Sequence, residues 1–575
     1  MEFKDIKANL KKDFTGFKKV KVALLADSST QYLAQAIRGM GYEKKLDIEV
    51  WEADYDSIDL TISDAASELY SFKPDFTFVF LSSHKLKKKF YKSGSNPHFA
   101  DDTLAYLKNV TATVSSHIKT NFLVFNFPDA LDPVFGHYSG KVTASFNYQV
   151  KKLNLELMHW AQNEASVSLI DLCGLQAMYG SANSIDSRMY LGSDSIFSLD
   201  FTIVVATNCV QVIEAFTGFS KKCLILDLDN TLWGGIIGDD GLENIQIGDL
   251  GIGKAFTEIQ LWAKALKERG IILAVCSKND EANAKEPFEK HPDMVLRPDD
   301  IAVFVANWSN KHDNIKYIQS VLNIGFDSMV FLDDNAFERN MVRTYLPEVT
   351  VPELPDDPAD YVANLNSLNL FETNAYTEED KERTQLYKAE ALRNTASLTY
   401  TSEADFLKSL DMVSEVKEFD AFTIPRVSQL TQRSNQFNLR TKRYTEQDIK
   451  HMAEDHKKHH TFSFTLSDKY GAHGLIGVII LEKKDAHTLF IDTWIMSCRV
   501  LKRGMEQFML NEITQYAKKH KFEKLTGEYL ETKKNGMVKD HYKNMGFTEK
   551  GEQWQLDVTA YKPAACFIKN SNTHE

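Results

Sequence analysis

Apolar runs that end in polar residues recur along the first part of the chain. KVKVALLA at 19–26, DFTFVFLS at 75–82 and TNFLVFNF at 120–127 are three of them, with helical patterns at 30–40 and 148–162. Uninterrupted apolar strands indicate burial on both faces, and their alternation with helices predicts a parallel α/β sheet. We therefore expect an α/β domain over residues 1–218.

Three later apolar runs also end in chemically capable side chains. CLIL is followed by Asp227 and Asp229, IILAVC by Ser277, and MVFL by Asp333 and Asp334. Ligands of open α/β sheets bind beyond the carboxyl ends of the strands. Residues i and i+2 of a strand share a face, so Asp227 and Asp229 can address one metal ion and one phosphate group. This pattern predicts a second α/β domain, at 219–355, built for phosphoryl chemistry.

The remaining chain mixes strand and helix patterns. PELPDDP at 352–358 is a proline-rich, acidic linker, and the charged stretch 377–393 indicates a connecting helix, so we expect a helical linker over 356–400. In residues 401–575, strand-like segments surround an amphipathic helix at 504–519 in an order that resembles the GNAT acyltransferase fold. The GNAT pyrophosphate loop R/Q-x-x-G-x-G/A is not reproduced at 499–504, which puts ordinary acetyl-CoA chemistry in doubt.

Composition narrows the class of protein. A chain of 575 residues is long enough for about three or four domains. No uninterrupted apolar run approaches the ~20 residues that span a bilayer, and the charged N-terminus does not resemble a secretory signal peptide, so we expect a cytoplasmic protein. The net charge of −13 gives no overall reason to bind nucleic acid or a membrane.

The six cysteines show no C-x-x-C pair, which argues against a zinc site and against a disulfide framework. One of them remains free to act as a reactive thiol. They are Cys173, Cys209, Cys223, Cys276, Cys498 and Cys566.

The second domain resembles the haloacid dehalogenase (HAD) phosphatase superfamily, whose four motifs it carries in order. They are Asp227-Leu-Asp229, Ser277, Lys311 after Asn307-Trp-Ser-Asn, and Asp333-Asp334. The resemblance implies that Asp227 attacks phosphorus to form an aspartyl phosphate, while Asp229 acts as general acid and base. The other roles it implies are phosphate binding by Thr231, Ser277, Lys278 and Lys311, and Mg²⁺ binding by Asp227, Asp229 through its backbone carbonyl, Asp334 and Asp333.

Each of these residues has a simpler alternative role. A strand-end aspartate is also a favoured helix N-cap, and Lys311 would be an ordinary surface lysine if it lay in solvent. The loops after Asp227 and after Ser277 are short, so this core resembles the HAD phosphatases that lack a cap domain. Such an open site suits a bulky substrate, or one that another domain covers.

Longer strings narrow the resemblance to the FkbH-like family, HAD subfamily IIIC. They are DLDNTLWGGIIGDDG and VFLDDNAFERNMVR in the second domain, and RVSQLTQRSNQFNLRT at 426–441 and WIMSCRV at 494–500 beyond it. The family transfers a glyceryl unit from 1,3-bisphosphoglycerate to an acyl carrier protein. The resemblance implies that Cys498 holds the acyl group, with the adjacent Arg499 favouring its thiolate. A small buried hydrophobe is the alternative role for Cys498.

Other candidates lie near these strings. Asn435 and Asn438 either polarise the acyl carbonyl or cap turns, and His473 is a weaker candidate for a base. A basic cluster stands out in an acidic chain and either binds substrate phosphate or an acidic carrier protein, or is a solvated face. It consists of Arg433, Arg440, Lys442, Arg443, Arg499, Lys502 and Arg503.

The turn Ala26-Asp27-Ser28-Ser29 resembles the nucleophile turn of SGNH hydrolases, with Ser28 as the serine. The family's late Asp-x-x-His is incomplete here, because Asp171-Leu-Cys173-Gly174 lacks the histidine and only His137 offers a substitute. A serine without a correctly held base is a poor nucleophile. We therefore expect a degenerate domain used for binding or as a scaffold.

Together these patterns predict a multidomain α/β enzyme that contains SGNH-like, HAD and GNAT-like regions. It would pair Mg²⁺-dependent phosphatase chemistry with transfer of a phosphoglycerate-derived acyl group to a carrier-protein thiol. Two alternatives stay open: a stand-alone phosphatase acting on a small phosphorylated metabolite, and a scaffold that binds carrier proteins.

Overall fold

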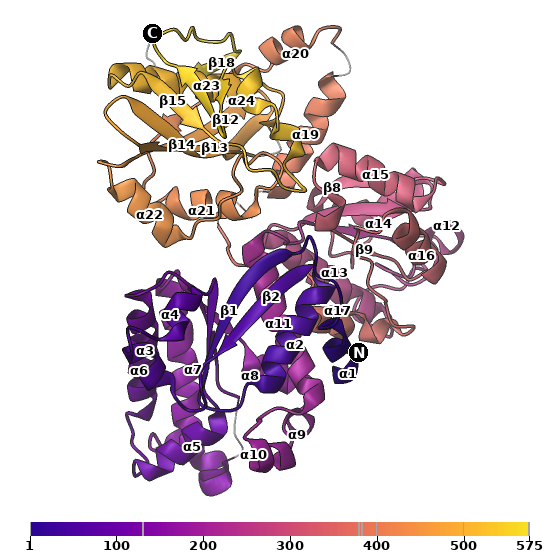
Figure 1. Ribbon diagram of the computed structural model, residues 1–575. Helices are drawn as coiled ribbons and strands as arrows, with labels where there is room; N and C mark the ends of the chain where they lie inside the picture. Colours follow the sequence, from indigo (N-terminus) through magenta and orange to yellow (C-terminus); the bar gives the residue numbers. More distant parts are fainter. Residues whose placement is uncertain are drawn as a thin grey trace. The chain divides into compact units, whose positions relative to one another are not determined.

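The computed structural model describes residues 2–128, 132–377, 380, 383–397, 400–497 and 500–572. The chain separates into two units, Met1–Glu214 and Ala215–Glu575 (Figure 1). The first unit holds one sheet, and the second holds a middle sheet and a C-terminal sheet.

The first sheet has five parallel strands in the order β2-β1-β3-β4-β5. Its strands are β1 (Lys18–Ala26), β2 (Leu46–Glu52), β3 (Phe76–Phe80), β4 (Asn121–Phe125) and β5 (Val167–Ile170). The expectation of a parallel sheet is confirmed. The edge strands β2 and β5 were not predicted, because an edge strand is partly exposed and its sequence is less uniformly apolar.

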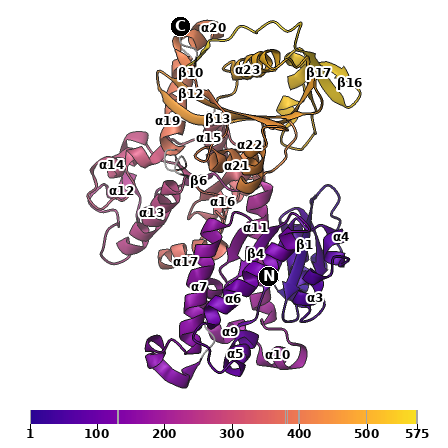
Figure 2. The ribbon, with the colours of Figure 1, turned by 90° about the vertical axis from the view of Figure 1, so that its left-hand side faces the viewer.

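Helices cover this sheet. They are α1 (Phe3–Asn9), α2 (Gln31–Glu43), α3 (Ile58–Ser63), α4 (Glu68–Phe72), α5 (Ser83–Lys92), α6 (Phe99–Ser115), α7 (Phe146–Asn163), α8 (Leu172–Tyr179), α9 (Ser181–Ser184), α10 (Ser187–Ser193) and α11 (Leu199–Thr217), with a 3₁₀ segment at Pro133–Lys141. The long helices α6 and α7 run side by side (Figure 2). Their apolar stripes share one core with alternate residues of the strands.

One described helix, α11, is unusually long and apolar. Its hydropathy and its 19 residues are sufficient, by length and composition, to cross a membrane. Polar residues within the helix interrupt its apolar runs, so the sequence shows no unbroken apolar run at this position. However, half of its most apolar window is buried inside the structure, as in a core helix, so it is weak evidence for a membrane span.

The middle sheet has four parallel strands in the order β8-β7-β6-β9. They are β6 (Cys223–Leu226), β7 (Ile272–Ser277), β8 (Ile301–Ala306) and β9 (Met329–Leu332). Every residue of β6, β7 and β9 is buried. Two separate cores explain this, because alternate strand residues pack on opposite faces. Leu224 and Leu226 join the core that includes α13 (Gly253–Glu268) and α17 (Tyr361–Leu368). Cys223 and Ile225 join the core that includes α15 (Lys311–Leu322) and α16 (Ala336–Tyr345).

The helices around the middle sheet are α12 (Ile237–Asp240), α13 (Gly253–Glu268), α14 (Glu281–Lys290), α15 (Lys311–Leu322), α16 (Ala336–Tyr345) and α17 (Tyr361–Leu368), with 3₁₀ turns at Pro298–Asp300, Phe326–Ser328 and Pro358–Asp360. Only the four-residue α12 and loops lie between β6 and α13, and three residues separate β7 from α14. Residues 223–377 are all described, and they contain no inserted cap domain, as predicted.

The C-terminal sheet is mainly antiparallel, in the order β16-β17-β15-β14-β13-β12-β10-β18, with β11 paired to β12. Its strands are β10 (Met412–Ser414), β11 (Val416–Lys417), β12 (His459–Asp468), β13 (Gly471–Lys483), β14 (Thr488–Met496), β15 (Lys524–Gly527), β16 (Thr548–Lys550), β17 (Gln553–Asp557) and β18 (Ile568–Asn570). Strands β14 and β15 pair in parallel across the crossover helix α23. This mixed α/β order agrees with the expected fold class.

The helices of this region are α19 (Arg383–Ser397), α20 (Glu403–Ser409), α21 (Ile424–Arg433), α22 (Glu446–Glu454), α23 (Met505–Lys519) and α24 (His541–Asn544), with a 3₁₀ turn at Gly536–Val538. Helix α19 lies within the stretch expected to be a helical linker. Its Tyr387 packs into the core of the middle sheet, so the helix is also part of that core.

Candidate active site

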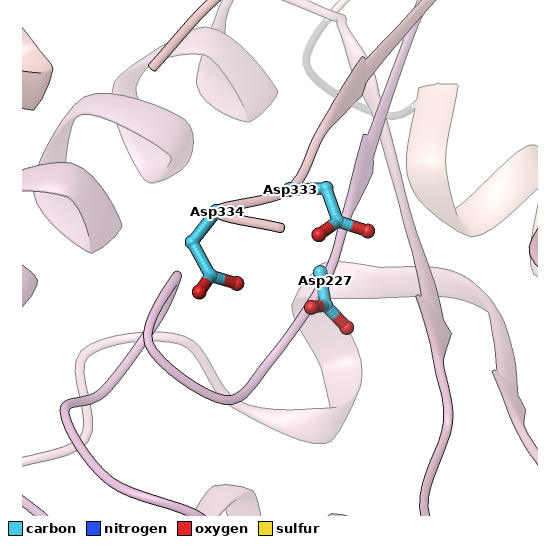
Figure 3. Close-up of side chains that lie close together, drawn as sticks. All are labelled: Asp227, Asp333 and Asp334. Atoms are coloured by element: carbon cyan, nitrogen blue, oxygen red, sulfur yellow. The ribbon is translucent and has the colours of Figure 1, made fainter. Parts of the chain in front are cut away.

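Three carboxylates converge at the carboxyl end of the middle sheet. Asp227 follows β6, and Asp333 and Asp334 follow β9; the two strands are parallel neighbours, so their ends meet at one edge. The three side chains point toward one space (Figure 3). One oxygen from each lies within 4.8 Å of the others. Oxygen ligands in this number are typical of a hard divalent cation such as Mg²⁺.

Lys311 is a buried counter-charge to two of these carboxylates. It is the first residue of α15, and its side chain is only 4% exposed. Its Nζ lies 2.9 Å from Asp227 Oδ2 and 2.6 Å from Asp333 Oδ2. Burial alone would lower the pKa of Lys311, but the two carboxylates raise it above its usual value. The structure therefore places Lys311 inside the site and not on the solvated surface.

The site is short of positive charge even with Lys311 present. Burial, and then the charge of Asp227, raise the pKa of Asp333 to about 7. Burial likewise raises the pKa of Asp334. Asp227 Oδ1 is buried and has no hydrogen-bond partner among the described residues. An unsatisfied buried oxygen and two carboxyl groups with raised pKa values fit a site that binds a cation.

Asp229 occupies a different position from the three clustered carboxylates. Its Oδ1 accepts hydrogen bonds from Trp233 Nε1 at 2.9 Å and from the Ile237 amide at 3.0 Å, and its Oδ2 accepts one from Asn279 Nδ2 at 2.9 Å. These donors fix the orientation of the carboxylate. A metal contact through its backbone carbonyl would leave the side chain available for proton transfer.

The predicted phosphate-binding residues have different surroundings. Thr231 is fully buried, and its Oγ1 accepts the Asp334 amide at 3.2 Å, which joins the two loops. Ser277 ends β7 and is 2% exposed, and its Oγ accepts a hydrogen bond from Asn279 Nδ2 at 3.2 Å. Lys278 Nζ pairs with Glu338 Oε1 at 2.6 Å, because that mostly buried carboxylate needs a cation. Lys278 is thus held by α16.

Sequence reasoning missed several residues that hold the site. Arg339 NH1 donates to the backbone carbonyls of Asp333 and Asp334 at 2.8 and 2.6 Å, and its NH2 pairs with Glu353 at 2.8 Å. Buried Gln260 fixes the loop after Asp227 by donating to the Leu232 carbonyl at 2.7 Å. Trp233 and Arg339 stand in the strings that carry the family resemblance, which was the available signal, whereas Asn279 and Gln260 lie outside those strings.

Asp333 and Asp334 do not act as the N-cap of helix α16, which was their alternative role. Helix α16 is capped by Asn335, whose side chain accepts the Phe337 amide at 2.9 Å. Asp333 Oδ1 accepts the Asn335 amide at 2.8 Å, so it stabilises the turn, while its Oδ2 faces Lys311.

The first unit does not assemble the SGNH triad. Ser28 is 3% exposed, and its Oγ has no hydrogen-bond partner among the described residues. Asp171 caps α8 through the Gly174 amide at 3.1 Å and accepts Asn126 Nδ2 at 2.7 Å. His137 is exposed, in the 3₁₀ segment. In the part of the chain that the structure describes, Ser28 therefore has no base beside it.

Replacing Ser28 by alanine is expected to leave catalysis unchanged. Removing a buried hydroxyl without a partner costs little stability, so the free energy of unfolding should change by less than about 1 kcal/mol. Hydrolysis of p-nitrophenyl acetate and of p-nitrophenyl phosphate by wild type and Ser28→Ala checks this. A selective loss of ester hydrolysis would show that the serine is a nucleophile.

Of the candidate residues in the C-terminal region, the structure describes some and not others. Cys498 and Arg499 lie outside the described residues. Asn435 donates to the Gly218 carbonyl at 2.9 Å and accepts from Arg443. Asn438 accepts the Thr441 amide at 2.8 Å and donates to the Ser434 carbonyl at 3.3 Å. Both asparagines therefore stabilise loops, as in their simpler alternative role.

The expected basic cluster is not one solvated patch. Arg433 pairs with Asp380 at 3.2 Å, and Arg440 pairs with Asp492 at 2.7 Å. Arg503 pairs with Glu390 and with Asp468. Arg443 donates to backbone carbonyls, and Lys442 lies 3.5 Å from Asp492. The carboxylate partners come from distant segments, so a count of charges along the sequence could not reveal them.

His473 belongs to a buried charge network. Its Nε2 lies 3.2 Å from Asp468 Oδ2 and 3.0 Å from Arg503 NH1, and the residue is 1% exposed. Burial lowers the pKa of His473. Asp468 also binds Arg393 at 2.7 and 2.8 Å. This arrangement supports a structural role for the histidine.

Comparisons with known proteins agree with this geometry. The family profile described as FkbH, N-terminal domain, matches residues 21–214. A crystal structure of the N-terminal part of a Bacteroides fragilis protein, containing a phosphatase domain and complexed with Mg, is 51% identical. That alignment covers 65% of this chain and 100% of that one, with a TM-score of 0.63. A comparison with curated proteins finds no match.

Two acetyltransferase structures align with a smaller part of the chain. One is a putative GNAT acetyltransferase from Desulfovibrio desulfuricans, at 12% identity over 26% of this chain and 99% of that one, with a TM-score of 0.21. The other is spermidine N-acetyltransferase from Vibrio cholerae, at 12% identity over 25% and 96%, also with a TM-score of 0.21.

The fold and the carboxylate site define a phosphatase domain of the HAD type. It consists of a parallel sheet whose strand ends present Asp227, Ser277 and Asp333, with Lys311 buried among the carboxylates. At 51% identity over the whole of the Bacteroides fragilis phosphatase structure, and with the FkbH profile on its first unit, the chain belongs to the FkbH-like family.

Proposed function

We propose that this enzyme transfers a glyceryl unit, or a related phosphorylated acyl unit, to the thiol of an acyl carrier protein. The donor is an acyl phosphate such as 1,3-bisphosphoglycerate. The HAD site of the enzyme then removes the phosphate that remains on the acyl group. The proposal places this chemistry in the cytoplasm. The observation that carries its phosphatase half is the buried cluster of Asp227, Asp333, Asp334 and Lys311.

Phosphate removal divides into two displacements. An oxygen of Asp227 attacks phosphorus, the phosphorus–oxygen bond to the substrate breaks, and Asp229 donates a proton to the leaving oxygen. Water then attacks the aspartyl phosphate, Asp229 takes the proton of that water, and inorganic phosphate leaves. Trp233 and Asn279 keep the Asp229 carboxylate in one orientation during both steps.

Mg²⁺ fits the oxygen ligands of this site, and the related phosphatase structure was crystallised with Mg. When bound by Asp227, Asp334 and the Asp229 carbonyl, it would supply charge that stabilises the phosphoryl group. Lys311 neutralises charge on the same group, and Arg339 holds the loop that carries Asp333 and Asp334.

The acyl-transfer half is proposed for the C-terminal region. The Cys498 thiolate would attack the carbonyl carbon of the acyl phosphate, and the carbon–oxygen bond to phosphate would break. Inorganic phosphate would be released, and the acyl group would remain on the enzyme as a thioester. The pantetheine thiol of the carrier would then take the acyl group, which returns the Cys498 thiolate. The family to which the chain belongs supports this half.

Intact masses of the carrier protein test both halves. Purified enzyme is incubated with Mg²⁺, 1,3-bisphosphoglycerate and a pantetheinylated acyl carrier protein. Wild type should produce glyceryl-carrier, Asp227→Asn should produce carrier that retains a phosphoglyceryl group, and Cys498→Ala should leave the carrier unmodified. Cys566→Ala is the matched control and should behave as wild type. Phosphate release without any carrier adduct would leave a stand-alone phosphatase and contradict acyl transfer.

A further inference from the structure

A cavity lies at the other end of the middle sheet from the carboxylates. Its volume is about 300 Å³, which suits a small metabolite. Its lining includes residues of helix α21, Met496 at the end of β14 with the following Ser497, and the segment before β9. Ser497, which precedes Cys498 in the sequence, is one of the residues that line the cavity.

The cavity is separate from the carboxylate site. It is lined by Lys222, which precedes β6, by Ile272, which begins β7, and by Ser328, which precedes β9. These are the amino ends of parallel strands whose carboxyl ends carry Asp227, Ser277 and Asp333. The five residue steps from Lys222 to Asp227 correspond to about 16 Å of extended chain. A small ligand therefore cannot occupy both sites at once.

The described lining carries an excess of positive charge. Its cationic residues are Lys222, Arg383, Arg426, Arg433, Lys533 and Lys534, whereas its only carboxylates are Asp327 and Glu348. Buried Asp380, behind the lining, pairs with Arg383 and Arg433, so the described cations still outnumber the described carboxylates by six to three. This excess contrasts with the net charge of −13 of the whole chain.

Arg433 shows that this positive charge is not fully satisfied. Its NH1 and NH2 have partners, but its Nε is buried and has no hydrogen-bond partner among the described residues. The pKa of Arg433 is lowered to about 9, first by burial and then by the like charge of neighbouring arginines such as Arg383. Burial would raise the pKa of Asp327, yet nearby lysines, chiefly Lys534, lower it. An anion would relieve this crowding of cations.

We propose that this cavity binds the phosphate group of a small phosphorylated acyl donor, and that Arg426, Arg433 and Lys222 supply the charge that recognises it. The inference deepens, and rests on, the acyl-transfer half of the proposed function. It adds a phosphate-binding site to the one in the phosphatase domain. Arginine suits this role because its planar guanidinium can donate two hydrogen bonds to one phosphate.

Calorimetric titration with 3-phosphoglycerate in EDTA tests the site. Wild type and Asp227→Asn should each bind one equivalent with the same Kd, because the cavity is remote from the carboxylates. Arg426→Gln should raise Kd at least about tenfold, the effect of losing one charge-assisted hydrogen bond. Arg188→Gln, an exposed arginine of the first unit, is the matched control and should bind as wild type. An unchanged Kd in Arg426→Gln, or binding lost in Asp227→Asn, would overturn the assignment.

A measurement on the wild-type chain keeps the proposal testable if Arg426→Gln does not fold. Lysine acetylation followed by peptide mass analysis should show that 3-phosphoglycerate protects Lys222 and Lys533, while exposed Lys562 reacts unchanged. Equal labelling with and without the ligand would refute the site.

Two further ligands distinguish the source of the phosphate. Glycerate, which lacks phosphate, should not bind. Pantetheine 4′-phosphate should bind more weakly than 3-phosphoglycerate; tighter binding would assign the cavity to the arm of the carrier and overturn the donor assignment. If no ligand binds but the carrier adduct still forms, only this inference fails. If 3-phosphoglycerate binds but no adduct forms, the acyl-transfer proposal fails.

Discussion

Asp227→Asn is expected to lower kcat for phosphate release from p-nitrophenyl phosphate by at least about a thousandfold, because an amide cannot replace the attacking carboxylate. Asp333 and Asp334 lie close by but cannot act as substitutes. Asp333 is held by Lys311 and by the Asn335 amide, and neither residue follows β6, from which the reacting oxygen is positioned.

The matched control for this variant is Asp249→Asn, which changes an exposed aspartate in the loop before α13 and should retain full activity. The release of p-nitrophenol, followed with Mg²⁺ present, gives kcat for each variant and for wild type. Activity of Asp227→Asn within tenfold of wild type would contradict the assignment of the nucleophile.

Lys311→Met is expected to be the most destabilising single change in this domain. It leaves Asp227 and Asp333 buried without the cation that lies 2.9 and 2.6 Å away, and breaking such a buried pair costs about 3–5 kcal/mol. Bound Mg²⁺ would replace part of the lost charge, so the destabilisation should be larger in EDTA than in Mg²⁺. Thermal unfolding by calorimetry in both buffers measures this difference.

Two further variants separate this effect from the loss of any lysine. Lys316→Met removes a half-exposed lysine of the same helix, which pairs with Asp313, and should cost no more than about 1 kcal/mol. Lys311→Met with Asp333→Asn should recover part of the lost stability, because one uncompensated carboxylate is gone. If Lys311→Met were no more destabilising than Lys316→Met, the buried pair would not be important for stability.

The sequence predicts strands that are buried on both faces better than strands that are partly exposed. Strands β6, β7 and β9 are covered on both faces, so their sequences are continuously apolar and easy to recognise. Strand β2, with the sequence LDIEVWE, is an edge strand whose charged residues conceal it. Strand β8, IAVFVA, carries the same apolar signal as its neighbours and was predictable by the same rule.

The site was predictable where chemistry follows directly from strand ends, as for Asp227 and Asp333, and Lys311 was identified from its HAD motif. It was not predictable where a side chain depends on a partner from another segment. The basic cluster is the clearest case, because Arg440 is matched by Asp492, 52 residues later, and Arg433 by Asp380, 53 residues earlier. Residue spacing along a chain contains no information about such partners, so a basic cluster in the sequence became a set of internal ion pairs.

The cavity and Asp227 lie at opposite ends of the strands of one sheet, and this separation limits how the two proposed half-reactions can be connected. A phosphoglyceryl group bound at the cavity is too far from the nucleophile to be hydrolysed there, so it must be transported between the two half-reactions. A flexible pantetheine arm can make that journey while keeping the group covalently attached. We therefore expect loading of the carrier to precede dephosphorylation. The carrier with its phosphoglyceryl group would then be a transient species, whose lifetime depends on how fast the arm moves from the cavity to Asp227.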